Sequence, residues 1–595
     1  MIRTPLRPLA KILKARQRGE NPDLIERENL RLRHESLQDR ARRRAEGRLL
    51  LMAGFFLCVF VVIGARMGMM AASQPSEPQA GVAGNAIVAS RADITDRHGR
   101  VLATNLLTYA LYAHPLEIID KPRAAGQLAE IFPDLDAGDL LNDFTGGRKF
   151  LWIKRKISPE QRQAVHDIGE PGLLFAPREM RLYPNGRLAA HVLGGTSFGK
   201  EGVSSAEVIG TAGIEMALDA ELRDPSRESA PLELSVDMSV QAAMTEVLAG
   251  GVTMLNAKGA AGVLMDVHTG EVLAMASLPD FDPNDRPPLP IEGDPADSPL
   301  FNRAVQGVYE LGSTFKIVAA AQAMELGLVN PNTKVNANAP LYWGKFKIGE
   351  YGGKNYGPTL SVSDVIVKSS NVGTAHIALK IGGKRQKAFY EQLGVLSKSP
   401  VELVETSRGV PLVPPNWSEI VTITASYGHG FSTSPMNLAA AYASILNGGT
   451  LVRPTLLKQD GPQNGPRVVS EAVSRASARM LREVVLRGTA SFGAVPGYAV
   501  GGKTGTANKV KRTGGYYNNK NINTFASVFP ADDPKYVLII TLDEASEESG
   551  SKPRRTAGWT AVPVAAEVIR RTAPLLGLEP EIDPAAASAI KLAAQ

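Results

Sequence analysis

The sequence predicts an α+β protein with a single N-terminal transmembrane helix, a mixed α/β domain, and a second domain in which one sheet is built from distant segments with helices between them. Three observations lead to this prediction. An uncharged apolar run lies near the N-terminus, short apolar stretches alternate with turn residues up to about residue 235, and strand patterns stand at both ends of residues 236–577 with helical patterns between them. Strands from distant segments can build one sheet when helices fill the sequence between them.

The first predicted element is the transmembrane helix. Leu49 to Ala65 form an uncharged run of 17 residues, which as a helix spans about 26 Å, slightly less than the hydrocarbon core of a bilayer. Residues 67–72 extend the span if Arg66 reaches a headgroup or a partner helix. A cleaved signal peptide has a short basic region before its apolar segment, whereas 48 residues precede this one. We therefore expect an uncleaved signal anchor at residues 49–72.

The charge distribution predicts the topology. Residues 1–48 hold 14 Lys and Arg against 7 Asp and Glu, and the whole chain has a net charge of +6. Basic segments beside transmembrane helices stay in the cytoplasm, so the N-terminus should be cytoplasmic and everything after about residue 73 should cross the membrane. The basic balance thus reflects topology, not nucleic-acid binding. Asp23 to Glu46 should form a charged juxtamembrane helix, either solvated or bound to anionic lipid or a cytosolic partner.

Two folded domains and a tail are expected after the anchor. Residues 73–235 begin with a linker rich in Pro, Ala, Gly and Ser and continue as a mixed pedestal domain, residues 236–577 form the second domain, and residues 578–595 form a flexible tail. A chain of 595 residues with 44% hydrophobic content can bury the cores of two or three domains. The second domain should open with residues 234–241 and a helix, and should contain strands at 262–266, 272–277, 499–506, 525–529 and 536–542 and a helix at 562–573.

Metal and disulfide chemistry are not indicated. The single cysteine, Cys58, lies inside the apolar segment, so neither a disulfide nor a thiolate metal site is available. The eight histidines are scattered without the His-Glu-x-x-His spacing of a zinc site. We expect no metal and no cofactor.

The first candidate catalytic motif is Ser313-Thr-Phe-Lys316. Gly312 precedes it and an apolar run follows, which predicts a buried helix that starts at the serine. Ser and Lys three residues apart share one helical face, so the amine can reach the hydroxyl and act as the base that a serine nucleophile needs. Lys316 must be neutral for this role, and burial together with a second cation, Lys503, would favour the neutral form. Two other Ser-x-x-Lys matches, at 197–200 and 549–552, lie in predicted loops.

Two further motifs complete the pattern. Ser369-Ser-Asn371 falls on a connection between two predicted helices, where a hydroxyl can relay a proton and an amide can hold a peptide carbonyl. Lys503-Thr-Gly505 lies in a predicted strand whose glycines permit a close approach of substrate backbone. Thr504 and Thr506 share one face of that strand, and a strand edge of this kind can pair with an extended peptide.

Each motif alone has an ordinary structural explanation. Ser313 alone reads as a helix N-cap, Ser-Ser-Asn as a turn, and Lys-Thr-Gly as a strand end. Their joint occurrence, in this order and in compatible local structure, favours the active site of a penicillin-interacting serine enzyme.

The chain resembles the class B penicillin-binding proteins from about residue 50 to about residue 572. Beyond the three motifs, similar signatures stand at residues 91–103, 181–186, 190–194 and 210–215 in the pedestal and at 266–279, 302–304, 428–430 and 440–443 in the second domain. The family usually has Arg-Gly where this chain has Arg91-Ala92, and Pro-Gly-Ser where it has Leu311-Gly-Ser, but neither difference removes a catalytic group. The resemblance implies a transpeptidase domain of the penicillin-binding and serine β-lactamase type, in which helices flank an antiparallel sheet. The chain looks most like the division-specific member of Gram-negative bacteria.

The resemblance also implies a role for each residue. Ser313 would attack the bond between the two terminal D-alanines of a stem peptide, Lys316 would accept its proton, Ser369 would pass a proton to the leaving amine, and Asn371 would orient the donor. The donor carboxylate would bind Lys503, Thr504 and Thr506 beside Gly505, and the backbone amides of Ser313 and Thr506 would form the oxyanion hole. β-Lactams would acylate Ser313.

The implied setting is the inner membrane, with the catalytic domain in the periplasm. The expected partners are donor and acceptor stem peptides, a polytopic glycosyltransferase that polymerises glycan strands, and other division proteins. Two alternatives remain for a class B enzyme, namely an elongation-specific transpeptidase and a β-lactam-binding sensor or scaffold that does not turn over. A β-lactamase is a further alternative, but the anchor and pedestal fit a wall-building enzyme better, and no Glu-x-x-Leu-Asn stretch lies between Asn371 and Lys503.

Overall fold

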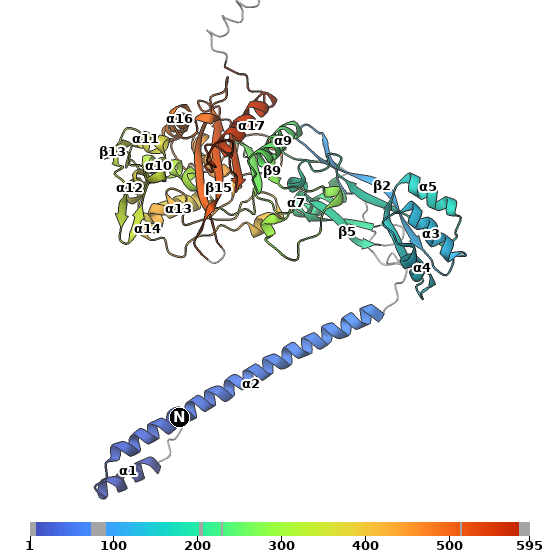
Figure 1. The fold of residues 1–595 in the computed structure, drawn as a ribbon, viewed down its shortest axis with the longest axis horizontal. Coiled ribbons are helices and arrows are strands. Elements are labelled where there is room, and N and C mark those ends of the chain that lie inside the picture. The colour runs from blue at the N-terminus through green and yellow to red at the C-terminus, as the bar shows by residue number, and fades with distance from the viewer. Residues whose placement is uncertain (1–6, 73–90, 202–205, 228–229, 512–513, 582–595) are drawn as a thin grey trace, which may run out of the picture. The chain divides into compact units, whose positions relative to one another are not determined.

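The computed structural model describes residues 7–72, 91–201, 206–227, 230–511 and 514–581, which form two compact units (Figure 1). The first unit contains residues 1–77, 112–153 and 163–174, and the second contains residues 78–111, 154–162 and 175–595. The predicted linker and most of the predicted C-terminal tail lie outside the described residues. All three candidate catalytic motifs belong to the second unit.

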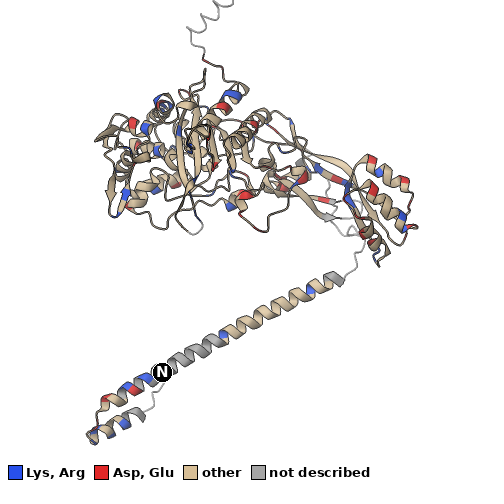
Figure 2. Ribbon diagram, viewed as in Figure 1, with Lys and Arg blue, Asp and Glu red and all other residues tan. Residues whose placement is uncertain are grey.

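The predicted anchor is part of one long helix in the first unit. Helix α2 (Pro22–Ala72) joins the charged juxtamembrane segment to the apolar span without a break. The segment Gly47–Met69 is long and apolar enough to cross a membrane, and none of it is buried in protein. Figure 2 shows this part of α2 almost entirely in tan, the colour of residues that are not Lys, Arg, Asp or Glu. A short helix that the sequence analysis did not foresee, α1 (Arg7–Gln17), packs beside the start of α2.

The remainder of the first unit consists mainly of two helices with side-chain caps. Helix α3 (Lys121–Ile131) begins after Asp120, whose carboxylate accepts a hydrogen bond from the backbone N–H of Arg123. Helix α4 (Ala137–Thr145) begins after Asp136, which caps the N–H groups of residues 138 and 139. Aspartate at this position satisfies N–H groups that have no partner within the helix.

The pedestal sheet confirms the mixed α/β character expected for this region. Strand β1 (Ile94–Thr95) pairs antiparallel with β2 (Val101–Ala113) and parallel with β7 (Leu232–Glu233). A separate hairpin joins β5 (Gly195–Glu201) to β6 (Ala206–Ala212). The other elements of this region are β3 (Leu151–Ile157), α5 (Pro159–Ile168), β4 (Leu173–Leu182), α6 (Ala190–Leu193), α7 (Gly213–Ala217) and α8 (Asp219–Leu222).

A buried ionic cluster lies at the centre of the pedestal signatures. The carboxylate of Glu215 accepts hydrogen bonds from Arg91 Nε at 2.6 Å and from Arg181 Nε at 2.7 Å, and all three side chains are almost fully buried. Arg91 also binds Asp219 at 2.6 Å, and this contact helps to hold the pKa of that carboxyl below its usual value against the effect of burial. Breaking a buried pair leaves an uncompensated charge, so these signatures are explained as structural contacts.

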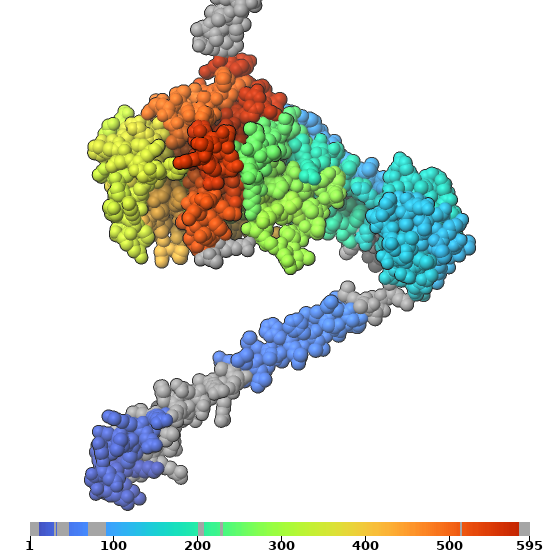
Figure 3. Space-filling view, viewed as in Figure 1, coloured from blue at the N-terminus to red at the C-terminus, as the bar shows by residue number. Residues whose placement is uncertain are grey.

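One five-stranded antiparallel sheet forms the centre of the second unit, in the order β14-β15-β16-β8-β9. Two of its strands precede Ser313 in the sequence and three come far after it, as the sequence predicted. Figure 3 shows segments from late in the chain, in orange and red, at the surface between green and yellow segments from earlier in the chain. The strands are β8 (Gly259–Asp266), β9 (Val272–Leu278), β14 (Gly501–Val510), β15 (Tyr516–Phe529) and β16 (Tyr536–Asp543).

Helices pack on this sheet and fill the sequence between its strands. Helices α9 (Met238–Met254) and α17 (Ala561–Leu575) pack against each other and against the sheet, and α15 (Pro435–Leu446) packs against β8 and β16. The remaining helices are α10 (Lys316–Glu325), α11 (Val362–Lys368), α12 (Asn371–Ile381), α13 (Gly383–Gln392), α14 (Glu419–Ala425) and α16 (Glu471–Arg487). Two short antiparallel strand pairs accompany them. Strand β10 (Lys334–Asn336) pairs with β13 (Thr359–Ser361), and β11 (Leu341–Trp343) pairs with β12 (Phe346–Ile348).

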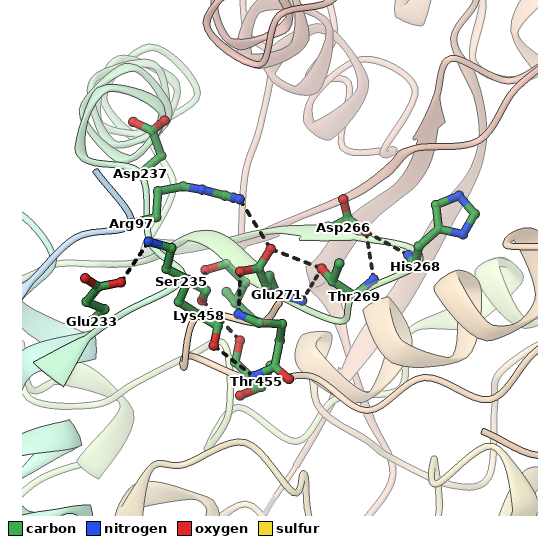
Figure 4. Close-up of polar contacts among 12 residues, drawn as sticks. Arg97, Glu233, Ser235, Asp237, Asp266, His268, Thr269, Glu271, Thr455 and Lys458 are labelled. Carbon is green, nitrogen blue, oxygen red and sulfur yellow. Dashed lines mark hydrogen bonds and ion pairs between the residues drawn. The ribbon is translucent and has the colours of Figure 1, made fainter. Parts of the chain in front are cut away.

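A polar cluster secures the turn between β8 and β9 (Figure 4). Asp266 accepts hydrogen bonds from the N–H groups of His268 and Thr269 at 2.7 and 2.9 Å, which closes the turn. The buried carboxylate of Glu271 then binds Arg97 at 3.4 Å and the backbone N–H of Gln459 at 3.0 Å. Segments far apart in the sequence are thereby joined at one end of the sheet.

Candidate active site

The nucleophile motif lies on a tight helical turn that runs into α10. The sequence analysis expected an α-helix from the serine, whereas residues Gly312–Phe315 form a 3₁₀ turn and the α-helix begins at Lys316. The predicted shared face survives this correction, because residues three apart eclipse each other in a 3₁₀ helix. Gly312 has φ 59°, and a Cβ there would lie 3.1 Å from the carbonyl oxygen of Thr506. The 3₁₀ turn therefore packs closely against β14.

Buried contacts hold the turn rigid. The hydroxyl of Tyr442, on α15, donates to the carbonyl oxygen of Thr314 at 2.6 Å, and Thr314 Oγ1 donates to the carbonyl oxygen of Leu311 at 3.0 Å. Phe315 is fully buried against Tyr390 and Phe431, with ring centroids 5.7 and 4.8 Å away. Ser313 itself is only half-buried, so its hydroxyl is reachable from solvent on a fixed support.

The amine of Lys316 lies at the centre of the site and is fully buried. Its Nζ is 2.5 Å from the carbonyl oxygen of Ser369, 3.1 Å from Ser369 Oγ and 2.7 Å from Asn371 Oδ1. Burial lowers the pKa of Lys316 to about 7, and the negative charge of Glu350 opposes this shift. A neutral amine has two N–H groups and one lone pair, so one of these oxygens must then be a hydroxyl that donates, which only Ser369 can be.

The second motif connects α11 to α12, as the sequence predicted. Ser369 ends α11 in the left-handed conformation with φ 59°, a geometry that non-glycine residues adopt rarely and mostly under structural constraint. Ser370 is the N-cap of α12, and its Oγ accepts the N–H of Gly373 at 2.9 Å. Asn371 is the first residue of α12, and its amide donates to the carbonyl oxygen of Gly349 at 2.9 Å.

The third motif brings a second buried amine to the same hydroxyl. Lys503 Nζ lies 3.0 Å from Ser369 Oγ and 3.0 Å from the carbonyl oxygen of Thr504. Burial lowers the pKa of Lys503 well below its usual value, and the charge of Lys316 lowers it further. Two charged amines around one buried hydroxyl repel each other, so the arrangement favours a single shared proton. A hydroxyl between two amines can pass a proton in either direction.

Strand β14 presents the remaining predicted residues. Thr504 is largely buried, and its Oγ1 lies 2.8 Å from Thr489 Oγ1. Thr506 is more exposed, and its Oγ1 accepts the backbone N–H of Ala557 at 3.0 Å, which leaves its own O–H free to donate. A Cβ on Gly505 would lie 2.2 Å from the carbonyl oxygen of Leu311. Only glycine therefore allows β14 to approach the nucleophile turn this closely.

Sequence reasoning missed several supporting residues. Glu350 contacts the second motif directly, Thr489 contacts Thr504, and Glu310 lies one turn before Ser313, where it accepts the N–H of Gly430 at 2.9 Å. The hydroxyl of Tyr516 also donates to Glu310, at 3.0 and 3.1 Å from its two oxygens. No local pattern distinguishes these side chains, because each acts on a segment that only the fold brings near.

Comparison with known proteins identifies the family. Residues 260–568 match the model of the penicillin-binding protein transpeptidase domain, and residues 86–227 match that of the penicillin-binding protein dimerisation domain. The chain belongs to the class B penicillin-binding proteins. The transpeptidase model covers the sheet and all three motifs, and the dimerisation model covers most of the predicted pedestal.

Individual relatives support the assignment along almost the whole chain. The probable peptidoglycan D,D-transpeptidase FtsI of Caulobacter vibrioides is 35% identical over 565 residues, which is 92% of either chain. The FtsI of Escherichia coli is 30% identical over 478 residues, covering 76% of this chain and 79% of that protein. Among solved structures, penicillin-binding protein 3 of Mycobacterium tuberculosis, complexed with aztreonam, has a TM-score of 0.61 at 26% identity, covering 83% of this penicillin-binding protein and 98% of the other chain.

Proposed function

We propose that this penicillin-binding protein crosslinks peptidoglycan stem peptides at the division septum through an acyl-enzyme on Ser313. The similarity to FtsI proteins over most of the chain supports the D,D-transpeptidase reaction and the septal role. The observation that carries the residue assignment is the position of Ser369 Oγ, 3.1 Å from one buried amine and 3.0 Å from the other, beside the turn of Ser313. These groups can move a proton from nucleophile to leaving group.

Acylation begins with proton removal from the nucleophile. Ser313 Oγ attacks the carbonyl carbon of the penultimate D-alanine, and its proton passes to the neutral amine of Lys316. The C–N bond then breaks, and a proton reaches the departing D-alanine amine through Ser369. The products are an ester on Ser313 and free D-alanine. The acceptor amine of a second stem peptide next attacks the ester carbon, a new amide forms, and Ser313 regains its proton.

Strand β14 would bind the donor peptide. We assign the donor carboxylate to Lys503 and to the hydroxyls of Thr504 and Thr506, while Asn371 orients the donor amide. The backbone N–H groups of Ser313 and Thr506 form the proposed oxyanion hole. The close approach of residue 312 to Thr506 supports this assignment, because it brings both N–H groups to neighbouring positions. Loss of one such donor costs about 3 kcal/mol in other enzymes.

The proposed membrane arrangement follows from the apolar helix and the basic tail. Residues 49–72 anchor the protein in the inner membrane, residues 1–48 remain in the cytoplasm, and the pedestal (73–235) and the transpeptidase domain (236–577) lie in the periplasm. The apolar, solvent-facing surface of Gly47–Met69 supports a lipid environment. The proposed partners are a glycan-polymerising glycosyltransferase and other division proteins.

The nucleophile assignment can be tested with a matched pair of serine variants. Ser313→Ala should abolish covalent labelling by a fluorescent penicillin, because no hydroxyl remains to form the ester. Ser549→Ala removes the serine of another Ser-x-x-Lys sequence, on an exposed loop, and should label like wild type. Labelling of folded Ser313→Ala at the wild-type rate would refute the assignment. Rapid turnover of nitrocefin by the wild type would instead favour a β-lactamase.

A further inference from the structure

Glu350 is a buried carboxylate that belongs to none of the three motifs. It follows β12 in the sequence and is 7% exposed. Its two oxygens accept three hydrogen bonds from the start of α12: from Ser370 Oγ at 2.5 Å, from the N–H of Asn371 at 2.7 Å and from the N–H of Val372 at 3.2 Å. All three donors lie immediately beside the residues that contact Lys316.

We propose that Glu350 is a positioning residue for acylation, which fixes the α11–α12 connection and thereby holds Asn371 and Ser369 against the amine of Lys316. The inference rests on the proposed roles of Ser313 and Lys316. Few contacts separate Glu350 from the amine. Glu350 accepts a hydrogen bond from the backbone N–H of Asn371, and Asn371 Oδ1 accepts a hydrogen bond from Lys316 Nζ at 2.7 Å. The connection needs such support because Ser369 occupies a strained left-handed conformation.

The carboxylate suits this position better than an amide would. An ionised carboxylate only accepts hydrogen bonds, and all three groups that face Glu350 are donors. A glutamine would present one oxygen and one NH₂ group, so at least one N–H of the helix start would face another donor. The adjacent backbone contact, from Asn371 Nδ2 to the carbonyl oxygen of Gly349 at 2.9 Å, would then have to shift.

Glu350 also carries a negative charge that acts on the base. It opposes the effect of burial on the pKa of Lys316, which would otherwise be lower still. The other charged group beside Lys316 is Lys503, on β14, and the two amines act on each other. A variant without the negative charge should therefore hold Lys316 neutral down to a lower pH.

The negative charge of Glu350 also acts on two nearby tyrosine hydroxyls. Burial raises the pKa of Tyr356, and Glu350 adds to this effect. Burial, with smaller contributions from Glu310 and Glu350, raises the pKa of Tyr427 to about 12. Both phenols therefore remain neutral in the pH range in which Lys316 titrates. Glu310 itself accepts hydrogen bonds from the hydroxyl of Tyr516 and the N–H of Gly430. The pH dependence near pH 7 consequently reports on the amines.

The test measures acylation by a fluorescent penicillin as a function of pH, on the full-length protein. Glu350→Gln should lower the second-order acylation constant by about tenfold or more at the optimum, and should move the acid limb of the profile to lower pH. Glu350→Asp keeps the charge and should keep the acid limb of the wild type. Glu402→Gln is the matched control, because Glu402 likewise accepts two hydrogen bonds, from Thr455 Oγ1 at 2.7 Å and Leu456 N at 2.8 Å, but contacts none of the catalytic motifs.

Each outcome shows whether Glu350 positions the groups around Lys316 or only stabilises the fold. A wild-type rate in Glu350→Gln, or a loss of equal size at every pH, would overturn the inference. If Glu350→Gln shows no cooperative melting transition, Ser370→Ala replaces it: a slower acylation supports positioning, and a wild-type rate contradicts it. Failure of the proposed function looks different, since the wild-type protein would then carry no adduct on Ser313.

Discussion

The contact between β14 and the nucleophile turn gives a sharp prediction for Gly505→Ala. The added Cβ would lie 2.2 Å from the carbonyl oxygen of Leu311 and 2.9 Å from Thr314 Cγ2. A carbon and an oxygen normally approach to about 3.3 Å, so strand and turn must separate by about 1 Å. Neither side can yield by a side-chain rotation alone, because Leu311 contributes a backbone atom and Thr314 is fully buried.

A displacement of this size acts on the reaction more than on stability. Overpacking of a well-ordered core costs about 1–3 kcal/mol, whereas misplacing reacting groups by about 1 Å can cost about a hundredfold in rate. We therefore expect Gly505→Ala to lower the acylation constant for a fluorescent penicillin by about a hundredfold, while it still melts cooperatively. Acylation is followed by gel fluorescence and stability by circular dichroism.

A glycine outside the site provides the control for this experiment. Gly250 lies on α9, and a Cβ there meets nothing within 4 Å. Gly250→Ala should leave acylation unchanged and raise stability by up to about 1 kcal/mol, because alanine favours the helix. Wild-type acylation by Gly505→Ala would refute the reasoning that the close approach of β14 builds the site.

Two further predictions concern pH. Because the pKa of Lys316 is about 7 and the neutral amine is the proposed base, acylation by a penicillin should rise as pH increases through about 7; a flat profile across that region would contradict Lys316 as base. His191 is buried against Phe281, and burial lowers its pKa to about 4. The unfolded chain therefore binds a proton between pH 6.5 and about 4 that the folded chain does not, so the melting temperature should fall as pH falls through this window. His191→Gln should show a shallower dependence, and an identical slope would argue against this cause.

Much of the fold could be predicted because periodicity marks its elements. In the sequence, the strands of the second unit and the helices α9 and α17 are apolar runs whose lengths suit a strand or a helix, and turn residues bound them. The second and third motifs lie where local structure was predicted, between two helices and in a strand, and the first lies on the turn that leads into the predicted helix. Those predictions depend only on neighbours in sequence, which is why they succeeded.

The parts of the site that could not be predicted from the sequence depend on contacts between segments that are distant in the chain. Glu350 and Thr489 touch catalytic motifs through the fold alone, so no spacing rule points to them. The 3₁₀ geometry at Ser313 results from the packing of Gly312 against Thr506, which the sequence around the serine does not encode. Tertiary contacts of this kind override local helix propensity.

The most direct test of the account is peptide-mapping mass spectrometry of the full-length protein after treatment with a penicillin. The account predicts one adduct, carried by the peptide that contains Ser313 and slow to hydrolyse. The other serine near the amines, Ser369, should stay unmodified, because it relays a proton and forms no bond with the substrate. An adduct on Ser369, or a folded protein with no adduct, would contradict the proposed acyl-enzyme.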